Sequence, residues 1–157
     1  MSNQWWSVQL PRIILVTLVA GIIVVACTQE PDLGLDLNDK PPPSFSFSGR
    51  TLAASFEILE LPLTKPLSKT NPFSFTGETI WKISAPERIK GGKWPSVTYG
   101  EIPSGFSQAV PDHGRPPTLV ENKLYAARIV GDQDAKTTLF FEIRNGKPVN
   151  VTDKFGH

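Results

Sequence analysis

The chain has 157 residues, which allows one domain with an N-terminal extension but not two domains. It contains one cysteine and two histidines, so an intrachain disulfide and a multi-cysteine zinc site are excluded. The formal net charge of +1 argues against a nucleic-acid-binding protein, which needs a basic face for phosphates. Proline (15 residues) and glycine (12 residues) are both frequent, which disfavours long helices.

An uncharged apolar run, IILVTLVAGIIVVA, occupies residues 13–26. Crossing a bilayer takes about 20 residues, so this run is short for a transmembrane helix and matches the apolar core of a secretory signal. Arg12 and the amino terminus supply the cationic region before it. We therefore expect residues 1–26 to be a helical signal peptide outside the fold. The alternative is an uncleaved membrane anchor.

The end of this run, Val24–Val25–Ala26–Cys27, resembles the lipobox of bacterial lipoproteins. The resemblance implies that the Cys27 thiol receives a diacylglyceryl group and that cleavage makes Cys27 the first residue, whose amine is then acylated. Several fatty chains hold a protein stably on a membrane, whereas one alone binds reversibly. In Gram-negative members, Asp after the cysteine retains the protein in the inner membrane. Because Thr28 stands there, the resemblance implies the outer membrane in such a source.

An acidic, proline-rich stretch follows, TQEPDLGLDLNDKPPP at residues 28–43. Its composition predicts a disordered tether, so we expect residues 27–43 to be the lipidated cysteine and its linker. Three aspartates in this stretch have a spacing that suggests calcium binding, but the glycine and terminal glutamate of an EF-hand loop are missing. We interpret Asp32, Asp36 and Asp39 as solvated linker residues.

From Ser44 onward, apolar and polar residues alternate with period 2, the pattern of half-buried strands. Asn145–Gly146 between two such runs is a strong hairpin signal. The pattern predicts that residues 44–157 form an all-β domain, an antiparallel β-sandwich of seven to eight short strands. The expected strands are 44–48, 53–61 (Phe56 and Ile58 inward, joined by Leu61 if a bulge forms near Leu59–Glu60), 78–85, 96–102, 106–110, 123–130, 137–143 and 147–151.

Residues 119–128, LVENKLYAAR, resemble the tyrosine-corner segment of fibronectin type III domains. In that segment a leucine precedes, by six residues, a tyrosine that starts a strand, and Leu119 and Tyr125 have this spacing. The resemblance implies a fibronectin III or immunoglobulin-like sandwich in which the Tyr125 hydroxyl bonds to upstream backbone. Trp81 is then expected to be a core tryptophan.

Catalytic and metal-binding residues are scarce. His113 lies beside Asp112 in a turn sequence, no GxSxG motif is present, and Ser104–Gly105 reads as a turn. Asp132 and Asp134 lie in a predicted hairpin loop, where aspartate is ordinary turn chemistry. The sequence therefore predicts no catalytic site, no metal and no cofactor.

Trp94, Tyr99 and Phe106 lie among glycines and prolines, where aromatic side chains can form a surface that binds sugars or proline-rich peptides. The alternative, which we favour, is that they complete the core beneath long loops. We expect a lipid-anchored protein of the cell envelope with a non-catalytic binding or structural domain. Its partners would be membrane lipid through acylated Cys27, together with another envelope protein, peptidoglycan or polysaccharide. The alternative function is an envelope hydrolase, or an inhibitor of one acting through residues 111–117 around His113.

Overall fold

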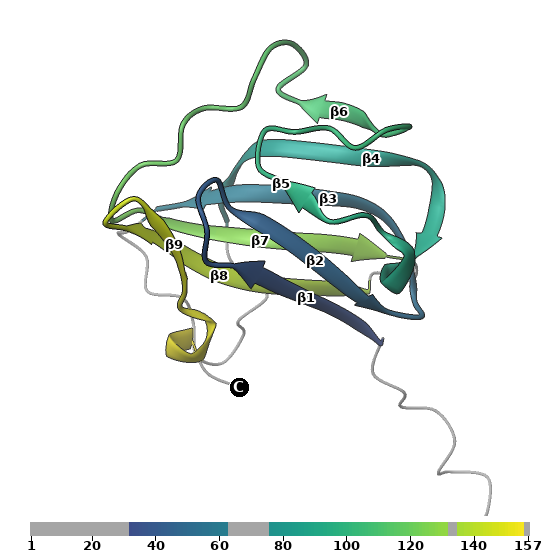
Figure 1. Cartoon of the computed structure of the whole chain (residues 1–157), viewed down its shortest axis with the longest axis horizontal. Helices are drawn as coiled ribbons and strands as arrows, with labels where there is room; N and C mark the ends of the chain where they lie inside the picture. Colours follow the sequence, from purple (N-terminus) through teal and green to yellow (C-terminus); the bar gives the residue numbers. More distant parts are fainter. Residues whose placement is uncertain (1–31, 63–75, 132–134, 156–157) are drawn as a thin grey trace, which may run out of the picture. The chain divides into compact units, whose positions relative to one another are not determined.

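The computed structural model describes residues 32–62, 76–131 and 135–155, in which nine strands form two antiparallel sheets packed as a β-sandwich (Figure 1). The predicted all-β sandwich is therefore confirmed, with one strand more than the seven to eight expected. The strands are β1 (Leu33–Asn38), β2 (Ser44–Gly49), β3 (Leu52–Leu61), β4 (Glu78–Lys90), β5 (Val97–Thr98), β6 (Ser107–Val110), β7 (Leu124–Gly131), β8 (Lys136–Arg144) and β9 (Lys147–Asn150).

The smaller sheet has the order β1-β2-β5 and contains the strand that the sequence did not predict. β1 pairs with the whole of β2, from Leu33 opposite Gly49 to Asn38 opposite Ser44. The expectation of a disordered tether over residues 27–43 is therefore wrong for residues 33–43. Leu33 and Leu35 are buried in the core of the sandwich, and Asp36 is exposed on the other face of β1. Residues 27–31 lie outside the described residues.

The turn between β1 and β2 also belongs to the folded domain. Pro43 is buried, and its carbonyl oxygen accepts a hydrogen bond of 2.8 Å from the Tyr99 amide. At the other end of β2, Gly49 has a φ of 100°, and a β-carbon there would collide with the Asp32 carbonyl oxygen. Glycine is therefore needed at this position for the chain to turn from β2 into β3.

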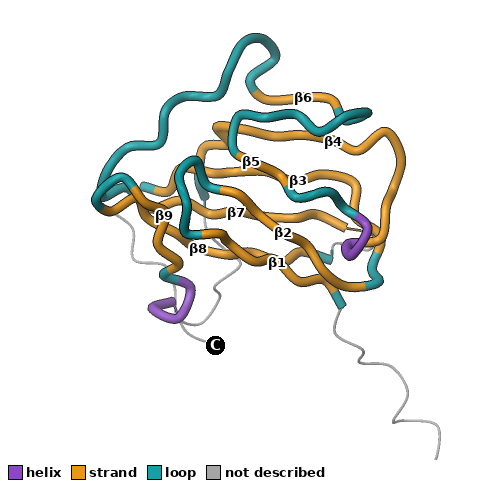
Figure 2. Tube along the Cα trace, viewed as in Figure 1, coloured by secondary structure: helices purple, strands orange, loops and turns teal. Residues whose placement is uncertain are grey.

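The larger sheet has the order β6-β4-β3-β7-β8-β9 (Figure 2). All of its named strand pairs are antiparallel. The predicted hairpin turn joins β8 and β9, and Asn145 and Gly146 have φ angles of 52° and 72°, as a turn of this type requires. The strand expected at residues 96–102 is much shorter, because only Val97 and Thr98 pair as β5. Two 3₁₀ helices, Gly91–Lys93 (η1) and Thr152–Phe155 (η3), complete the secondary structure.

Aromatic side chains fill the space between the sheets. Phe45 of β2 and Phe56 of β3 are fully buried, with ring centroids 5.0 Å apart. Phe45 also contacts Phe141 of β8 at 5.7 Å. Trp81 of β4 is fully buried and meets Phe56 edge-on, which confirms its predicted core position. These contacts join the two sheets through one apolar core.

A second apolar cluster lies on the outer face of the larger sheet. Leu61 belongs to it and does not face inward with Phe56 and Ile58, because an inward Leu61 requires a bulge in β3 near Leu59–Glu60. β3 pairs with β7 without a register shift from Ser55 to Leu61, so Leu59 and Leu61 alternate onto the outer face. The cluster consists of Leu59, Leu61, Leu124, Ala126, Phe140 and Val151, with Val149 and Phe155 packed against it.

Candidate binding cleft

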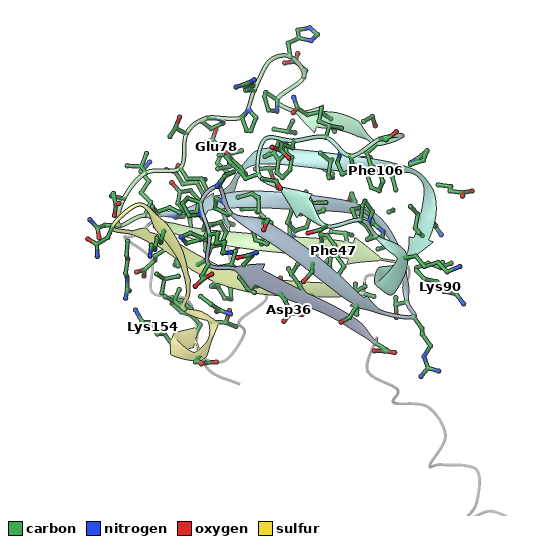
Figure 3. The ribbon with its side chains drawn as sticks, in the orientation of Figure 1. Asp36, Phe47, Glu78, Lys90, Phe106 and Lys154 are labelled. Atoms are coloured by element: carbon green, nitrogen blue, oxygen red, sulfur yellow. The ribbon has the colours of Figure 1, made fainter. Side chains whose placement is uncertain are left out.

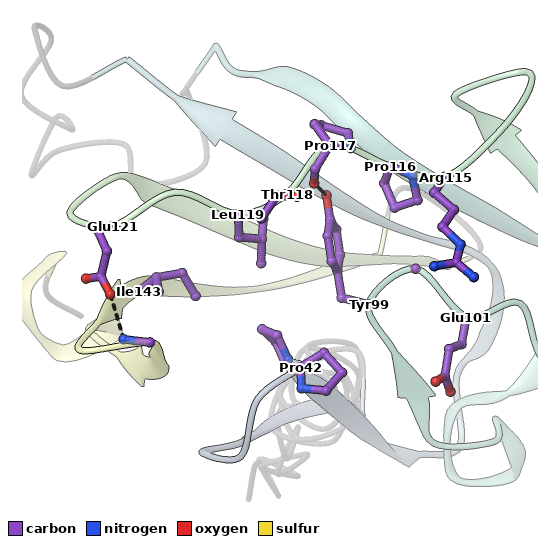
Figure 4. A pocket seen from close by; sticks show the side chains of 13 residues that line it. Pro42, Tyr99, Glu101, Arg115, Pro116, Pro117, Thr118, Leu119, Glu121 and Ile143 are labelled. Atoms are coloured by element: carbon purple, nitrogen blue, oxygen red, sulfur yellow. Dashed lines mark hydrogen bonds between the residues drawn. The ribbon is translucent and has the colours of Figure 1, made fainter.

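A cleft of about 550 Å³ opens at the end of the sandwich where β2 and β7 begin and β8 ends (Figure 4). Its volume lies within the range of roughly 300–1,000 Å³ that is typical of small-molecule sites. Loops from both sheets form its walls. The lining residues used below are proline or apolar (Pro42, Pro116, Pro117, Leu119, Ile143), aromatic (Tyr99) or charged (Glu101, Arg115, Glu121).

Tyr99 stands at the centre of the cleft, directly after β5 (Figure 4). Its hydroxyl donates a hydrogen bond of 2.7 Å to the Pro117 carbonyl oxygen. Its ring meets Trp81 edge-on, with centroids 5.3 Å apart. Burial, followed by the nearby Tyr125 hydroxyl and Glu60 carboxylate, raises the pKa of Tyr99 well above its ordinary value of 10. The hydroxyl therefore keeps its proton at neutral pH and remains the donor that fixes the loop at Pro117.

The tip of the loop between β6 and β7 is held by a single side-chain amide. Gln108 of β6 donates through Nε2 to the carbonyl oxygens of Pro111 (2.8 Å) and Gly114 (2.9 Å). Its Oε1 accepts a hydrogen bond of 3.2 Å from Nε1 of Trp81. Both amide protons and the amide oxygen of Gln108 are therefore engaged, and the buried tryptophan orients the amide that holds the loop.

A third hydrogen bond fixes the loop where it enters β7. The Tyr125 hydroxyl accepts a hydrogen bond of 2.8 Å from the Val120 amide. Tyr125 is fully buried and its ring stacks on Phe141 at 5.4 Å. This is the bond to upstream backbone that was expected for Tyr125, and Leu119 packs against the core. Burial raises the pKa of Tyr125, against the lowering effect of the Val120 amide, so this hydroxyl is also protonated at neutral pH.

Glu121 closes the far side of the cleft against the β8–β9 hairpin. Its two carboxylate oxygens accept hydrogen bonds from the amides of Asn145 (3.1 Å) and Gly146 (2.6 Å). The neighbouring Asn122 amide donates to the Ile143 carbonyl oxygen at 3.0 Å. Both oxygens of Glu121 are thus occupied by the turn, which gives Glu121 a structural role in shaping the cleft.

The other two charged lining residues stand at the opposite mouth. Arg115 and Glu101 are exposed on facing loops (Figure 4). Within the described residues, neither side chain forms an ion pair or hydrogen bond, and the two are not paired with each other. The mouth therefore presents one free cation and one free anion.

The three aromatic residues that the sequence singled out do not form one surface. Trp94 is only 5% exposed and contacts Phe47 and Phe106, with ring centroids 5.3 and 5.0 Å away. Phe47 and Phe106 are labelled in Figure 3. Phe106 is half-buried against the core. The binding-surface hypothesis is therefore wrong for Trp94 and Phe106, which complete the core as the alternative proposed. Tyr99 alone lines the cleft.

The candidate catalytic residues are not brought together with a nucleophile. His113 and Asp112 are exposed at the tip of the β6–β7 loop, and Ser104 is exposed in the turn before Phe106. Among residues 32–62, 76–131 and 135–155, no group of three or more potential metal ligands occurs. In the same ranges there is no apolar helix of membrane-crossing length. The signal peptide, Cys27, Asp132 and Asp134 lie outside the described residues.

Sequence reasoning missed Gln108, Arg115 and Glu101 as parts of the site. Gln108 sits in a short run with no distinctive spacing, and its role depends on a tryptophan 27 residues away. Arg115 was included only within the candidate inhibitory segment 111–117, and Glu101 only within the expected strand 96–102, of which Val97 and Thr98 alone form β5. The sequence feature that could have pointed to this loop was the cluster of prolines around Arg115. An ordered loop of this length requires contacts with residues outside its own sequence.

No protein-family model, no curated protein and no solved structure matches this chain.

Proposed function

We propose that the protein is a lipid-anchored component of the bacterial cell envelope whose β-sandwich is a non-catalytic binding module. The lipobox-like VVAC sequence supports the anchor, with Cys27 as the acylated first residue of the mature chain. Because β1 starts at Leu33, five residues separate Cys27 from the first strand, and a fully extended chain bridges at most about 21 Å between them. This short connection favours a role close to the bilayer.

We also propose that the domain is an immunoglobulin-like sandwich, and the strand connectivity supports this. In such sandwiches strands A, B and E share one sheet, and C, F and G share the other. Here β1, β2 and β5 form one sheet, while β3, β7 and β8 are neighbours in the other, with β4 in the place of an additional strand beside C. Tyr125 is the second residue of β7, the equivalent of strand F, near whose start the tyrosine corner belongs. Sandwiches of this kind host many functions, so the binding role rests on the cleft.

One observation carries the binding role, namely a cleft whose longest wall is ordered before any ligand arrives. The β6–β7 loop has no regular secondary structure, yet side chains of Gln108, Tyr99 and Tyr125 bond to its backbone at four points. A loop that is already ordered loses little conformational entropy on binding, which favours affinity. Binding residues are often found on loops held by a rigid scaffold.

The anchor is tested by replacing Cys27 with serine and feeding cells an alkyne-tagged fatty acid. We expect label and membrane association for the wild type, and neither for Cys27→Ser. If Cys27→Ser stays in the membrane after carbonate washing, residues 1–26 are an uncleaved anchor and the lipoprotein proposal is overturned. In a Gram-negative source, density fractionation should place the wild type in the outer membrane.

The binding module is tested by photo-crosslinking in the membrane fraction. A photoreactive residue at Thr118, in the cleft wall, should capture an envelope component. The same residue at Lys93, which is exposed in η1 at the other end of β2, is the matched control. Equal capture at both positions, or none at Thr118, contradicts a binding role for the cleft.

A second candidate function is inhibition of an envelope hydrolase by the loop tip. The observation that favours it is the Gln108 amide, which bonds to carbonyl groups on both sides of Asp112 and His113 and leaves these two side chains exposed. Replacing both by alanine should abolish inhibition in a panel of envelope hydrolases if the loop is the inhibitory segment. Hydrolysis by the purified protein itself, lost in the same variant, would support the enzyme alternative instead.

A further inference from the structure

We infer that the cleft binds a short peptide that carries both a free carboxylate and a free ammonium group, as the peptide stems of peptidoglycan do. This inference rests on the proposed binding function of the same cleft. It starts from Arg115 and Glu101, which lie at the same end of the cleft without an ion pair between them (Figure 4). A ligand that carries one negative and one positive charge can satisfy both side chains.

The charge of the cleft selects against polyanions. Arg115 is the one cation among its lining residues, while Glu101 and Glu121 are carboxylates. A nucleic acid or a polyphosphate would meet more like charge than opposite charge there. A zwitterionic ligand instead places its carboxylate on the Arg115 guanidinium, which can form two parallel hydrogen bonds with it. Its ammonium group then pairs with Glu101.

The walls fit small apolar side chains. Pro116, Pro117, Leu119 and Ile143 all line the cleft. These residues offer apolar contacts but no free polar side chain, which suits alanine methyl groups along a peptide. Glycan stacking is less favoured, because Tyr99 is the one aromatic lining residue, and it is half-buried with its hydroxyl already bonded to Pro117.

Exposed apolar residues beside the cleft extend the same surface. Three large apolar side chains are exposed among the described residues, and two of them, Ile102 (47%) and Val120 (49%), adjoin lining residues in the chain. A peptide attached to a larger polymer would contact them where it leaves the cleft.

The test is calorimetric titration of the mature, non-acylated protein with the free diaminopimelate-containing tetrapeptide stem of peptidoglycan. We expect saturable one-to-one binding that weakens at least tenfold in Arg115→Gln and in Glu101→Gln. Arg50→Gln is the matched control, because Arg50 is an exposed arginine at the opposite end of β2 from the cleft. The same tetrapeptide with its amine acetylated and its carboxylates amidated should not bind.

A linear all-L peptide with the same charges is the second arm, because it separates recognition of the peptidoglycan stem from recognition of any zwitterionic peptide. Equal binding of the two peptides would overturn the stem as the occupant, and no binding of the stem, or unchanged affinity in both cleft variants, would overturn the inference as a whole. These failures leave the proposed function intact if Thr118 still captures an envelope component. Loss of that capture as well would mean that the proposed function has failed too.

Discussion

The central strands and the β6–β7 loop of this domain are both ordered, but by different means. In β3, β4 and β7 the backbone is satisfied by ladder hydrogen bonds, and buried side chains hold the sheets together. In residues 111–120 the backbone has no ladder, and side chains from elsewhere bond to it. Apolar burial therefore fixes the framework of strands, whereas a few polar side chains fix the shape of the cleft.

The largest effect on stability is expected from truncating a side chain in the apolar core between the sheets. Phe56 is fully buried and contacts Phe45, Phe47 and Trp81. Phe56→Ala should lower the free energy of unfolding in urea by about 3–5 kcal/mol, because it leaves a cavity between the sheets. Ile102→Ala, at a side chain 47% exposed, is the control and should change stability by less than about 0.5 kcal/mol. A loss below about 1 kcal/mol at Phe56 would contradict the assigned core.

A smaller but more local effect is expected at Gln108. Gln108→Ala removes the partners of the Trp81 indole and of two loop carbonyl groups, which should cost about 1–3 kcal/mol of stability. Hydrogen exchange in the β6–β7 loop should become faster while exchange in β3 and β7 stays slow. Ser107→Ala, at the exposed neighbouring residue, is the control and should leave both unchanged. Uniformly faster exchange would show that loop and framework are one cooperative unit.

The tyrosines predict how the loop responds to alkali. Both have a pKa raised in the folded protein, so between pH 10 and their folded pKa values the unfolded chain loses protons that the folded chain retains. The free energy of unfolding should therefore fall as the pH rises above 10. Tyr99→Phe should make this fall less steep, with Tyr125 still contributing to it. An unchanged slope in Tyr99→Phe would contradict the burial of that hydroxyl.

The smallest effect is expected at Trp94, whose buried indole Nε1 has no hydrogen-bond partner among the described residues. Replacing it with phenylalanine removes this unsatisfied donor and also some packing against Phe47 and Phe106, two effects of opposite sign. Trp94→Phe should therefore stay within about 1 kcal/mol of the wild type in thermal unfolding. Trp81→Phe, whose indole is bonded to Gln108, should be clearly less stable. Equal losses for the two variants would contradict this distinction.

The same contrast explains what the sequence could and could not predict. Half-buried strands show alternating apolar and polar residues in the sequence, so β2, β3, β7 and β8 were predicted close to their observed bounds. β1 was missed because the acidic and proline-rich composition of residues 28–43 was taken as the signal for the whole stretch. Within it, Leu33, Leu35 and Leu37 alternate with other residues along the six residues of β1. The alternating leucines were the better guide, since they decide which face is buried.

The cleft was much less predictable than the sheets. Tyr125 was found because its spacing from Leu119 has a known structural meaning. The bonds made by Tyr99 and Gln108 connect residues through the packing of the sheets, and no local pattern encodes them. Trp94 and Phe106 were grouped with Tyr99 because all three lie among glycines and prolines in the sequence. Trp94 is buried against Phe47 of β2, and Phe106 packs against Trp94, so their burial depends on a strand far from them in the chain.

The exchange rate of the Val120 amide is the most direct measure of whether the β6–β7 loop is ordered without a ligand. Val120 lies outside every strand with its side chain 49% exposed, and its amide has the Tyr125 hydroxyl as its partner. If side chains order this loop without a ligand, the ligand-free protein should protect this amide at least tenfold over an unstructured peptide. Tyr125→Phe should remove that protection. Exchange at the unstructured rate in the wild type would show that the cleft wall is not ordered before binding.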